Sequence, residues 1–441
     1  MPNQPLDRRA FLRGASAAAA LPFLTHALAP SLAPAWATPR RADTLRVGVV
    51  GLGGRGTGAA LQALAADADA VLWAVGDLFP DRVEGSLRHI EAHLSEQGRM
   101  DRLQLPAERR FIGFDAYRHV IDSGVDVVLL TAYPAFRPAH LEYAVERGKH
   151  VFAEKPVAVD APGVRRVLAA GEAARAGKLT LVSGFCWRYA DAEKAAFAKL
   201  REGVIGRVLG VHSTYHTSTL PRRPRRPEWS DMEFQLRNWW HFTWISGDHI
   251  VEQAVHSIDR LSWAMSDETP VRCVALGGRA AREGPEHGNA YDHFTVIYEY
   301  ADGRRAFHTT RQIDNCPNDN SDYIQGTEGR GVINGFAGRH EFFDHGGARL
   351  WSYDGPRRDM YQNEQDFFFR SIREGSAHND GADMCRSTML AVMGRMAAYT
   401  GATISWDQAW NSKEDLTPPA PLAFGPLPTP TVAVPGRTRV L

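Results

Sequence analysis

Residues 45–56 read LRVGVVGLGGRG, a short apolar run followed by a glycine-rich turn. The run Leu45–Val50 has the length and the valine content of a buried strand. Gly51, Gly53 and Gly56 follow with the spacing G-x-G-x-x-G, and a helical pattern of apolar residues comes next. In such a unit the glycines allow a tight turn, a close approach of the backbone to a pyrophosphate, and close packing of helix on strand. The stretch therefore predicts the first unit of a dinucleotide-binding domain.

An acidic residue follows the second expected strand, at the position that contacts ribose in dinucleotide-binding domains. Asp77 comes after the apolar run 71–75 and about 20 residues after Gly56, so its carboxylate can accept hydrogen bonds from the ribose hydroxyls. A carboxylate repels the 2′-phosphate of NADP, so NAD is the preferred cofactor and NADP the less favoured one; Arg82 lies near enough to weaken this preference. The alternative is that Asp77 caps the helix expected at residues 80–94.

Strands and helices alternate along the first half of the chain. Further strands are expected at 126–130, 150–153 and 180–184, and helices at 138–147 and 161–176. This alternation predicts an α/β fold with right-handed βαβ units and a doubly wound parallel sheet. A ligand should then bind beyond the carboxyl ends of the strands.

The composition is that of a globular protein with more than one domain. The chain has 441 residues, of which 44% are hydrophobic and 23% charged, and this excludes a disordered chain, a collagen-like repeat and a coiled coil. The formal net charge is zero, so no general attraction to nucleic acid or to an anionic membrane is expected. The four cysteines lie far apart and lack metal-binding spacings, which argues against a disulfide framework and a zinc site.

The first 37 residues have the features of a twin-arginine export signal. Arg8 and Arg9 precede an alanine-rich apolar stretch at 15–29, and Ala35 and Ala37 offer the small residues that a signal peptidase reads. We therefore expect cleavage near Ala37, transport by the Tat export machinery, and a periplasmic or otherwise exported protein. The alternatives are a mitochondrial-type presequence and a disordered basic tail. The apolar stretch is too short for stable insertion in a membrane.

A charged tripeptide, Glu154-Lys155-Pro156, stands directly after the strand expected at 150–153. At this edge of the sheet, a lysine can hydrogen-bond an oxygen that changes between hydroxyl and carbonyl. The alternative is a solvated lysine in a turn. With the glycine motif, the tripeptide makes the sequence resemble the glucose–fructose oxidoreductase and inositol 2-dehydrogenase family (Gfo/Idh/MocA) over most of residues 45–415.

The resemblance implies an N-terminal Rossmann domain and a C-terminal α/β domain with an open, mostly antiparallel sheet for substrate binding and oligomerisation. The limits we expect are 38–186 and 187–416, followed by a proline-rich tail at 417–441. Members of the family oxidise or reduce sugars and cyclitols with NAD or NADP, and the lysine of the tripeptide, here Lys155, is catalytic. A homodimer or homotetramer is expected. The expected cofactor contacts are Gly51, Gly53, Gly54, Arg55, Gly56, Asp77, Glu154 and Lys155.

The family carries a D-x-x-x-H-x-x-D pattern on a helix of the second domain. Here His256 matches the acid/base histidine, Glu252 stands one turn earlier in place of the usual aspartate, and Asp259 follows three residues later. On one helix, Glu252 and His256 face the same side. A neutral imidazole takes a hydroxyl proton near neutral pH, so His256, with Lys155 and Glu252, is expected to be catalytic. The alternative for His256 is a hydrogen-bonded core histidine.

Three further features have weaker interpretations. His249, Glu252 and His256 share a helical face that a metal could use, but the resemblance already explains His256, so no metal is expected. The basic loop Arg222–Arg226 fits recognition of an anionic sugar, although a solvated or interface loop is favoured. Tryptophans near residue 240 offer faces for sugar stacking, but aromatic side chains are more often buried. The expected substrate contacts are Arg188, Tyr189, Trp239, Trp240 and Asp259.

Three functions remain open at this point. The first is an exported oxidoreductase that acts on a sugar or cyclitol with a tightly bound NAD, restored by a second substrate in a closed redox cycle. The second is an NAD-dependent glycoside hydrolase, which oxidises a hydroxyl transiently, eliminates the aglycone, adds water and reduces the product. The third is a non-catalytic sugar-binding protein, against which the retained Lys155 and His256 argue.

Overall fold

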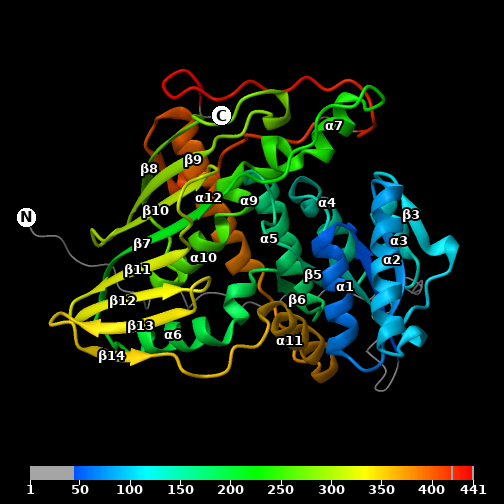
Figure 1. Ribbon diagram of the computed structural model, residues 1–441, viewed down its shortest axis with the longest axis horizontal. Helices are drawn as coiled ribbons and strands as arrows, with labels where there is room; N and C mark the ends of the chain where they lie inside the picture. Colours follow the sequence, from blue (N-terminus) through cyan, green and yellow to red (C-terminus); the bar gives the residue numbers. More distant parts are fainter. Residues whose placement is uncertain (1–43, 419–420, 440–441) are drawn as a thin grey trace, which may run out of the picture. The chain divides into compact units, whose positions relative to one another are not determined.

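The computed structural model of the protein describes residues 44–418 and 421–439 (Figure 1). The export signal predicted for residues 1–37 and its cleavage site lie outside the described residues. Within them, no helix has both the length and the apolar character needed to cross a membrane. The four cysteines are free thiols.

The first sheet is parallel and six-stranded, with the strand order β3-β2-β1-β4-β5-β6. It confirms the doubly wound α/β fold expected from the sequence. The sequence did not predict β3, a three-residue edge strand that is too short to show a periodic pattern. The strands are β1 (Leu45–Val50), β2 (Ala70–Asp77), β3 (Arg110–Ile112), β4 (Val127–Leu130), β5 (His150–Ala153) and β6 (Leu181–Ser183).

Five helices connect these strands, and their ends follow the local sequence. Pro80 starts α2 because proline has a helix-compatible φ and needs no amide partner there. Asp160 caps α5 by accepting a hydrogen bond from the Gly163 amide at 2.8 Å. The helices are α1 (Gly54–Ala66), α2 (Pro80–Glu96), α3 (Ala116–Asp122), α4 (Arg137–Glu146) and α5 (Ala161–Ala176). The 3-10 turns are Met100–Arg102, Ala107–Arg109 and Pro134–Phe136.

The second sheet has nine strands in the order β14-β13-β12-β11-β7-β10-β9-β8-β15. All neighbours are antiparallel except β7 and β10, so the expected open, mostly antiparallel sheet is confirmed. Strands β9 and β10 form an antiparallel hairpin. The strands are β7 (Val208–Thr217), β8 (Arg272–Gly278), β9 (His293–Glu299), β10 (Arg305–Gln312), β11 (Ser321–Gly326), β12 (Gly329–Asn334), β13 (Arg339–Asp344), β14 (Arg349–Ser352) and β15 (Ile404–Ser405).

Short helices lie between β7 and β8, where the sequence suggested one helix that carries Glu252 and His256. The chain instead leaves the helical path at Gln253 and Ala254, because the Ala254 amide bonds the His249 carbonyl, one residue further back than in an α-helix. The segment therefore forms two helices. The helices here are α7 (Asp231–Arg237), α8 (Thr243–Ser246), α9 (His249–Glu252) and α10 (Val255–Ala264), with a 3-10 turn at Trp239–His241; another 3-10 turn, Pro285–His287, lies between β8 and β9.

The last long helices return to the first sheet. Helix α11 (Met360–Glu374) packs on α1, and α12 (Gly381–Thr400) packs on α5 and on β8 (Figure 1). One apolar core consequently includes residues of both sheets, such as Leu130 and Val296. The domain limits at residues 186 and 416 stay predictions, because the core continues across them. The remaining elements are a 3-10 turn at Cys186–Tyr189, α6 (Asp191–Arg201) and α13 (Trp406–Trp410).

The proline-rich tail lies against its own chain. The Met232 amide donates to the Gly425 carbonyl at 3.1 Å, and the Gln235 amide group donates to the Leu427 carbonyl at 2.7 Å. The ring of Phe424 packs on two aromatic rings of the first domain, with centroids 5.7 Å from Phe79 and 5.1 Å from Phe114. The tail thus contacts both α7 and the segments that follow β2 and β3.

Candidate active site

A cleft opens at the carboxyl ends of the parallel strands, where a ligand was expected. It has a volume of about 410 Å³, a size typical of small-molecule sites. Its walls come from the glycine loop after β1, from the segments that follow β2, β4, β5 and β6, and from the helices α9 and α10. The predicted site residues that line it are Gly51, Gly53, Gly54, Arg55, Gly56, Asp77, Glu154, Lys155, Trp239, Trp240, Glu252 and His256.

The glycine loop has two tight positions and two open ones. Gly51 has a φ of 96°, and a Cβ at Gly56 would lie 1.9 Å from the Gly51 carbonyl oxygen. These glycines are required by the backbone itself. By contrast, a Cβ at Gly53 or Gly54 would meet no atom within 4 Å. The space beside them, at the start of α1, fits a pyrophosphate that binds to backbone amides.

Asp77 ends β2 with its carboxylate beside this loop. It accepts hydrogen bonds from the Leu52 amide at 2.6 Å and from the Phe79 amide at 3.0 Å. Helix α2 has Phe79 at its cap position and no side-chain cap, so the capping interpretation of Asp77 is wrong. Burial raises the pKa of Asp77, and the two amides and Arg82 act in the opposite direction. The carboxylate therefore lies in the cleft beside the glycine loop.

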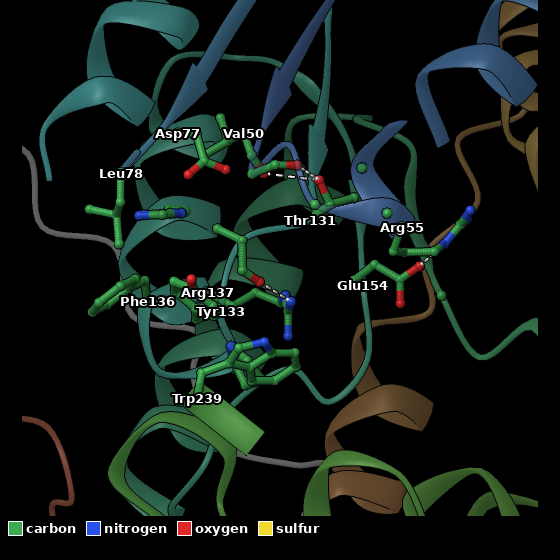
Figure 2. Close-up of a pocket in the computed structure, with 18 of the residues that line it drawn as sticks. Val50, Arg55, Asp77, Leu78, Thr131, Tyr133, Phe136, Arg137, Glu154 and Trp239 are labelled. Atoms are coloured by element: carbon green, nitrogen blue, oxygen red, sulfur yellow. Dashed lines mark hydrogen bonds and ion pairs between the residues drawn. The ribbon is translucent and has the colours of Figure 1, made fainter. Parts of the chain in front are cut away.

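Aromatic side chains form the wall beyond Asp77, and the sequence did not indicate them. Phe114, Tyr133 and Phe136 line the cleft, and the Tyr133 ring lies 5.4 Å from the ring of Trp239. Figure 2 shows Tyr133 and Phe136 below Asp77 and Leu78, with Trp239 at the opposite end. Flat apolar walls of this kind suit a planar base. Tyr133 and Phe136 come from a 3-10 segment that has no motif of its own.

Arg55 binds two carboxylates from distant parts of the chain. Its Nε lies 2.5 Å from Glu154 and its Nη2 2.9 Å from Glu364 of α11 (Figure 2 shows the first pair). Burial disfavours the charge, but the two carboxylates raise the pKa of Arg55 above its ordinary value. The side chain therefore holds the glycine loop against β5 and α11. Glu364 could not be found from sequence, since 309 residues separate it from Arg55.

Lys155 is held by Glu252 across the cleft. Its Nζ donates to the Glu252 backbone oxygen at 2.6 Å and to Glu252 Oε1 at 3.1 Å. The side chain is 13% exposed, so Lys155 is not the solvated lysine of the alternative interpretation. The contact fixes the ammonium group at the floor of the cleft, between the Rossmann sheet and α9.

His256 lies next to this pair and has a buried ring. Its Nδ1 is buried and has no hydrogen-bond partner in the part of the chain that the structure describes, so Nε2 is the ring nitrogen that remains to be reached from the cleft. Burial holds the pKa of His256 well below its usual range, and the charges of Lys155 and Arg260 add to this effect. The imidazole is therefore neutral at neutral pH and able to accept a proton.

Three predicted substrate contacts lie outside the cleft. Arg188 Nε donates to Asp259 at 2.9 Å, and its Nη2 lies 2.8 Å from Asp267. The Tyr189 hydroxyl donates to Asp380 at 3.0 Å. Asp259 is 1% exposed and also accepts from Ser387. These groups satisfy one another inside the protein, so the structure does not support Arg188, Tyr189 and Asp259 as substrate contacts.

His249 does not join His256 at the cleft. Its Nδ1 lies 3.1 Å both from Asp248 and from the Tyr291 carbonyl oxygen, and its ring packs on Phe294. Among residues 44–418 and 421–439, no cluster of three histidine, cysteine, aspartate or glutamate side chains is arranged to hold a metal ion.

The loop Arg222–Arg226 pairs with carboxylates of its own surroundings. Arg225 lies 2.7 Å from Asp231, and Arg222 and Arg226 each lie 3.9 Å from a glutamate. These arginines are about half exposed. Such pairs agree with a solvated loop.

Comparison with known proteins identifies both parts of the chain. Residues 45–183 match the profile described as oxidoreductase family, NAD-binding Rossmann fold, and residues 194–332 match the GFO/IDH/MocA C-terminal domain. The chain belongs to the GFO/IDH/MocA oxidoreductase family. Its first domain is an NAD-binding Rossmann domain, which agrees with the open space beside Gly53.

Individual relatives are more distant. Inositol 2-dehydrogenase of Acidiphilium cryptum is 27% identical over 262 residues, which is 59% of this chain and 66% of that protein. A 2,7-anhydro-N-acetylneuraminate hydratase of Escherichia coli is 27% identical over 41% of this chain and 44% of its own length. The chain thus spans less than two thirds of these relatives. A solved levoglucosan dehydrogenase in complex with NADH and levoglucosan has the same fold, with a TM-score of 0.65 and 19% identity over 82% of this chain and 99% of that one.

Proposed function

We propose that this member of the family is an enzyme that exchanges two electrons between NAD and a ring hydroxyl of a sugar or cyclitol. The observation that carries the proposal is the convergence of Lys155, Glu252 and His256 in the cleft that begins at the glycine loop. A relative named inositol 2-dehydrogenase supports the substrate class. The family's aspartate is a glutamate here, and Glu252 still reaches the lysine.

Each of the three side chains has a separate task. NAD, when bound, supplies a two-electron acceptor. Nε2 of the neutral His256 accepts the hydroxyl proton of the substrate. The ammonium of Lys155 donates a hydrogen bond to the same oxygen, and this bond strengthens as the oxygen becomes a carbonyl. Glu252 fixes the ammonium in place, since the Lys155 Nζ bonds both its backbone oxygen and its carboxylate.

We further propose that the cofactor stays bound through successive turnovers and that a second sugar restores it. The argument is the export signal predicted for residues 1–37, because no free NAD pool is expected outside the cytoplasm. Export itself is tested by replacing Arg8 and Arg9 with lysine and by sequencing the N-terminus of protein recovered from the periplasm. The expected results are loss of export in the variant and a mature chain that begins near Thr38.

The main experiment uses the mature protein, purified from an exporting host without added cofactor. Nucleotide content is measured by absorbance and mass, and inositol, levoglucosan and common aldoses are then supplied as donors and acceptors. Bound NAD or NADH together with oxidation of one sugar and reduction of another supports the proposal. A nucleotide-free protein that turns over only with added NAD contradicts the closed cycle. NADP in place of NAD contradicts the assignment of Asp77.

A second candidate is redox-assisted cleavage of a glycoside. A relative that is named a hydratase supports it, because addition of water involves no net oxidation. The same three side chains serve a transient oxidation that the enzyme reverses within one turnover. Release of the aglycone from aryl glycosides, with nucleotide content unchanged and no sugar acceptor present, would favour this candidate over the first.

We also propose a homodimer or homotetramer that forms through the second sheet. Leu276, Phe307 and Tyr323 are 78%, 38% and 40% exposed. Strand pairing places Phe307 and Tyr323 on either side of His212, so they share one face of the sheet. Light scattering measures the assembly, and Leu276→Glu is expected to shift it towards the monomer.

A further inference from the structure

One cleft residue outside the family pattern has a hydrogen-bonding direction fixed by its neighbours. Gln253 lies between α9 and α10 and lines the cleft beside Glu252. Its Oε1 accepts a hydrogen bond from Nε2 of Gln312, at 2.7 Å. Gln312 is the last residue of β10 and is 1% exposed. Within the described part of the chain no group bonds the Nε2 of Gln253, so its two N–H groups are available to the cleft.

A buried arginine stands behind this pair of amides. Arg282 is 4% exposed, and its Nη2 donates to Gln312 Oε1 at 2.5 Å. Its own backbone amide donates to Asp292, which holds the loop after β8 in place. Arg282, Gln312 and Gln253 therefore form one chain of hydrogen bonds that runs from the interior to the cleft.

Donor and acceptor chemistry gives this chain one direction. A guanidinium only donates, so Gln312 must present its oxygen to Arg282. The nitrogen of Gln312 then faces Gln253, which must present its own oxygen in return. The amide nitrogen of Gln253 is the group that remains for the cleft. A free glutamine turns its amide either way, whereas this one is held with its donor outward.

We infer that Gln253 is a substrate-binding residue that donates a hydrogen bond to an oxygen of the substrate, and that Arg282, acting through Gln312, is the positioning residue that fixes this donor. The inference rests on the proposed function. Because Glu252 is the adjacent residue and holds Lys155, the oxygen concerned lies near the reacting carbon. The ligand class is a polyol or sugar with an acceptor oxygen, a hydroxyl or carboxylate, at this position.

The first test replaces the donor at the cleft. Gln253→Met keeps the length of the side chain but removes the donor, and Gln253→Glu keeps the acceptor for Gln312 but presents an acceptor to the substrate. With whichever of inositol, levoglucosan and D-glucose the wild type oxidises fastest, we expect a rise in KM of about 2- to 10-fold for Gln253→Met, and a larger rise for Gln253→Glu. NADH affinity should stay unchanged in both variants. The melting temperature should stay unchanged in Gln253→Glu and fall modestly in Gln253→Met, which also leaves the buried Nε2 of Gln312 without its acceptor. Gln104→Glu, the same chemical change at an exposed position, is the matched control.

The second test reverses the direction of the chain of hydrogen bonds without touching Gln253. Gln312→Glu still accepts from Arg282, but both its oxygens are acceptors, so Gln253 must turn its nitrogen inward and its oxygen towards the cleft. Gln312→Glu should therefore raise KM as Gln253→Glu does. A role in folding alone would lower the melting temperature without this change in substrate binding.

Monodeoxy analogues of the substrate identify the oxygen. In the wild type, removal of the contacted hydroxyl should raise KM, and in Gln253→Met the same removal should have no further effect, because the two changes delete one hydrogen bond. If every hydroxyl contributes equally in wild type and variant, or if Gln253→Met has the wild-type KM, the inference is wrong. Binding of these sugars to the wild type is measured by tryptophan fluorescence in the presence of NADH. If the wild type binds them but oxidises none, the proposed function is wrong, and the same comparisons are then made with dissociation constants in place of KM. Binding of none of them would overturn both.

Discussion

Gly53→Ala should separate nucleotide binding from folding. Gly53 has φ −78° and ψ −171°, which alanine adopts without strain, and its added Cβ would meet no atom within 4 Å. The cost to the fold is limited to the change of residue at the start of α1, about 1 kcal/mol or less. For a chain of this size, that corresponds to a fall in melting temperature of at most about 2 °C.

The same methyl group would stand where the backbone approaches the pyrophosphate. Overfilling a packed contact typically costs about 1–3 kcal/mol, which weakens binding of NAD by about 5- to 150-fold. Gly56→Ala is the contrasting variant, because its Cβ would lie 1.9 Å from the backbone oxygen of Gly51. Neither backbone can move far, so Gly56→Ala should lower the yield of folded protein or its melting temperature sharply.

The measurements are the melting temperature without cofactor and the dissociation constant of NADH from fluorescence titration. The reasoning predicts a nearly normal melting temperature with weak NADH binding for Gly53→Ala. A Gly53→Ala protein that binds NADH as tightly as the wild type would refute the placement of the pyrophosphate. A Gly56→Ala protein with unchanged stability would refute the packing at the glycine turn.

Three further predictions concern other parts of the molecule. Lys155→Met removes the hydrogen bond to the reacting oxygen, so turnover should fall at least about 100-fold. It also leaves the buried carboxylate of Glu252 without its cation, so the free energy of unfolding should fall by about 3 kcal/mol. Adding Glu252→Gln should restore stability in denaturant titrations but not turnover. Phe424→Ala removes a ring that supports Phe114 of the cleft wall, so NADH should dissociate faster in stopped-flow experiments, whereas an unchanged rate would show that the tail is irrelevant to retention. Burial lowers the pKa of His150 to about 4. Between about pH 6.5 and pH 4 this histidine is therefore protonated in the unfolded chain but not in the folded one, so the free energy of unfolding falls with decreasing pH by up to about 1.4 kcal/mol per pH unit. Denaturant titrations of His150→Asn should show a weaker pH dependence.

The parts of the site that could be predicted depend on local signals. The spacing of the glycines, Asp77 at a strand end and Lys155 after another strand each follow from a few neighbouring residues. The parallel sheet then brings them together, because all carboxyl ends of its strands meet at one edge. His256 was placed by the family resemblance, and the structure puts it in the same cleft as Lys155.

The parts that could not be predicted depend on contacts between distant segments. Glu364 and Gln312 are ordinary residues of a helix and a strand, and only the packing of the whole chain gives them their partners. The expectation for Asp259 failed for a related reason. The sequence shows a carboxylate one turn from His256, but not that Arg188 and Ser387 already bond it inside the protein.

The return of α11 and α12 to the first sheet has a consequence for the order in which the chain acquires its ligand. The glycine loop leaves the ribosome early, yet Glu364, which holds Arg55 of that loop, is made some 300 residues later. Helices α1 and α5 likewise lack their packing partners until α11 and α12 have been synthesised. A nascent chain that carries all six parallel strands thus exposes apolar surface on both layers and has an unfinished nucleotide pocket. Tight cofactor binding should therefore wait until α11 and α12 have been synthesised, so the C-terminal part of the chain decides when the nucleotide can be held.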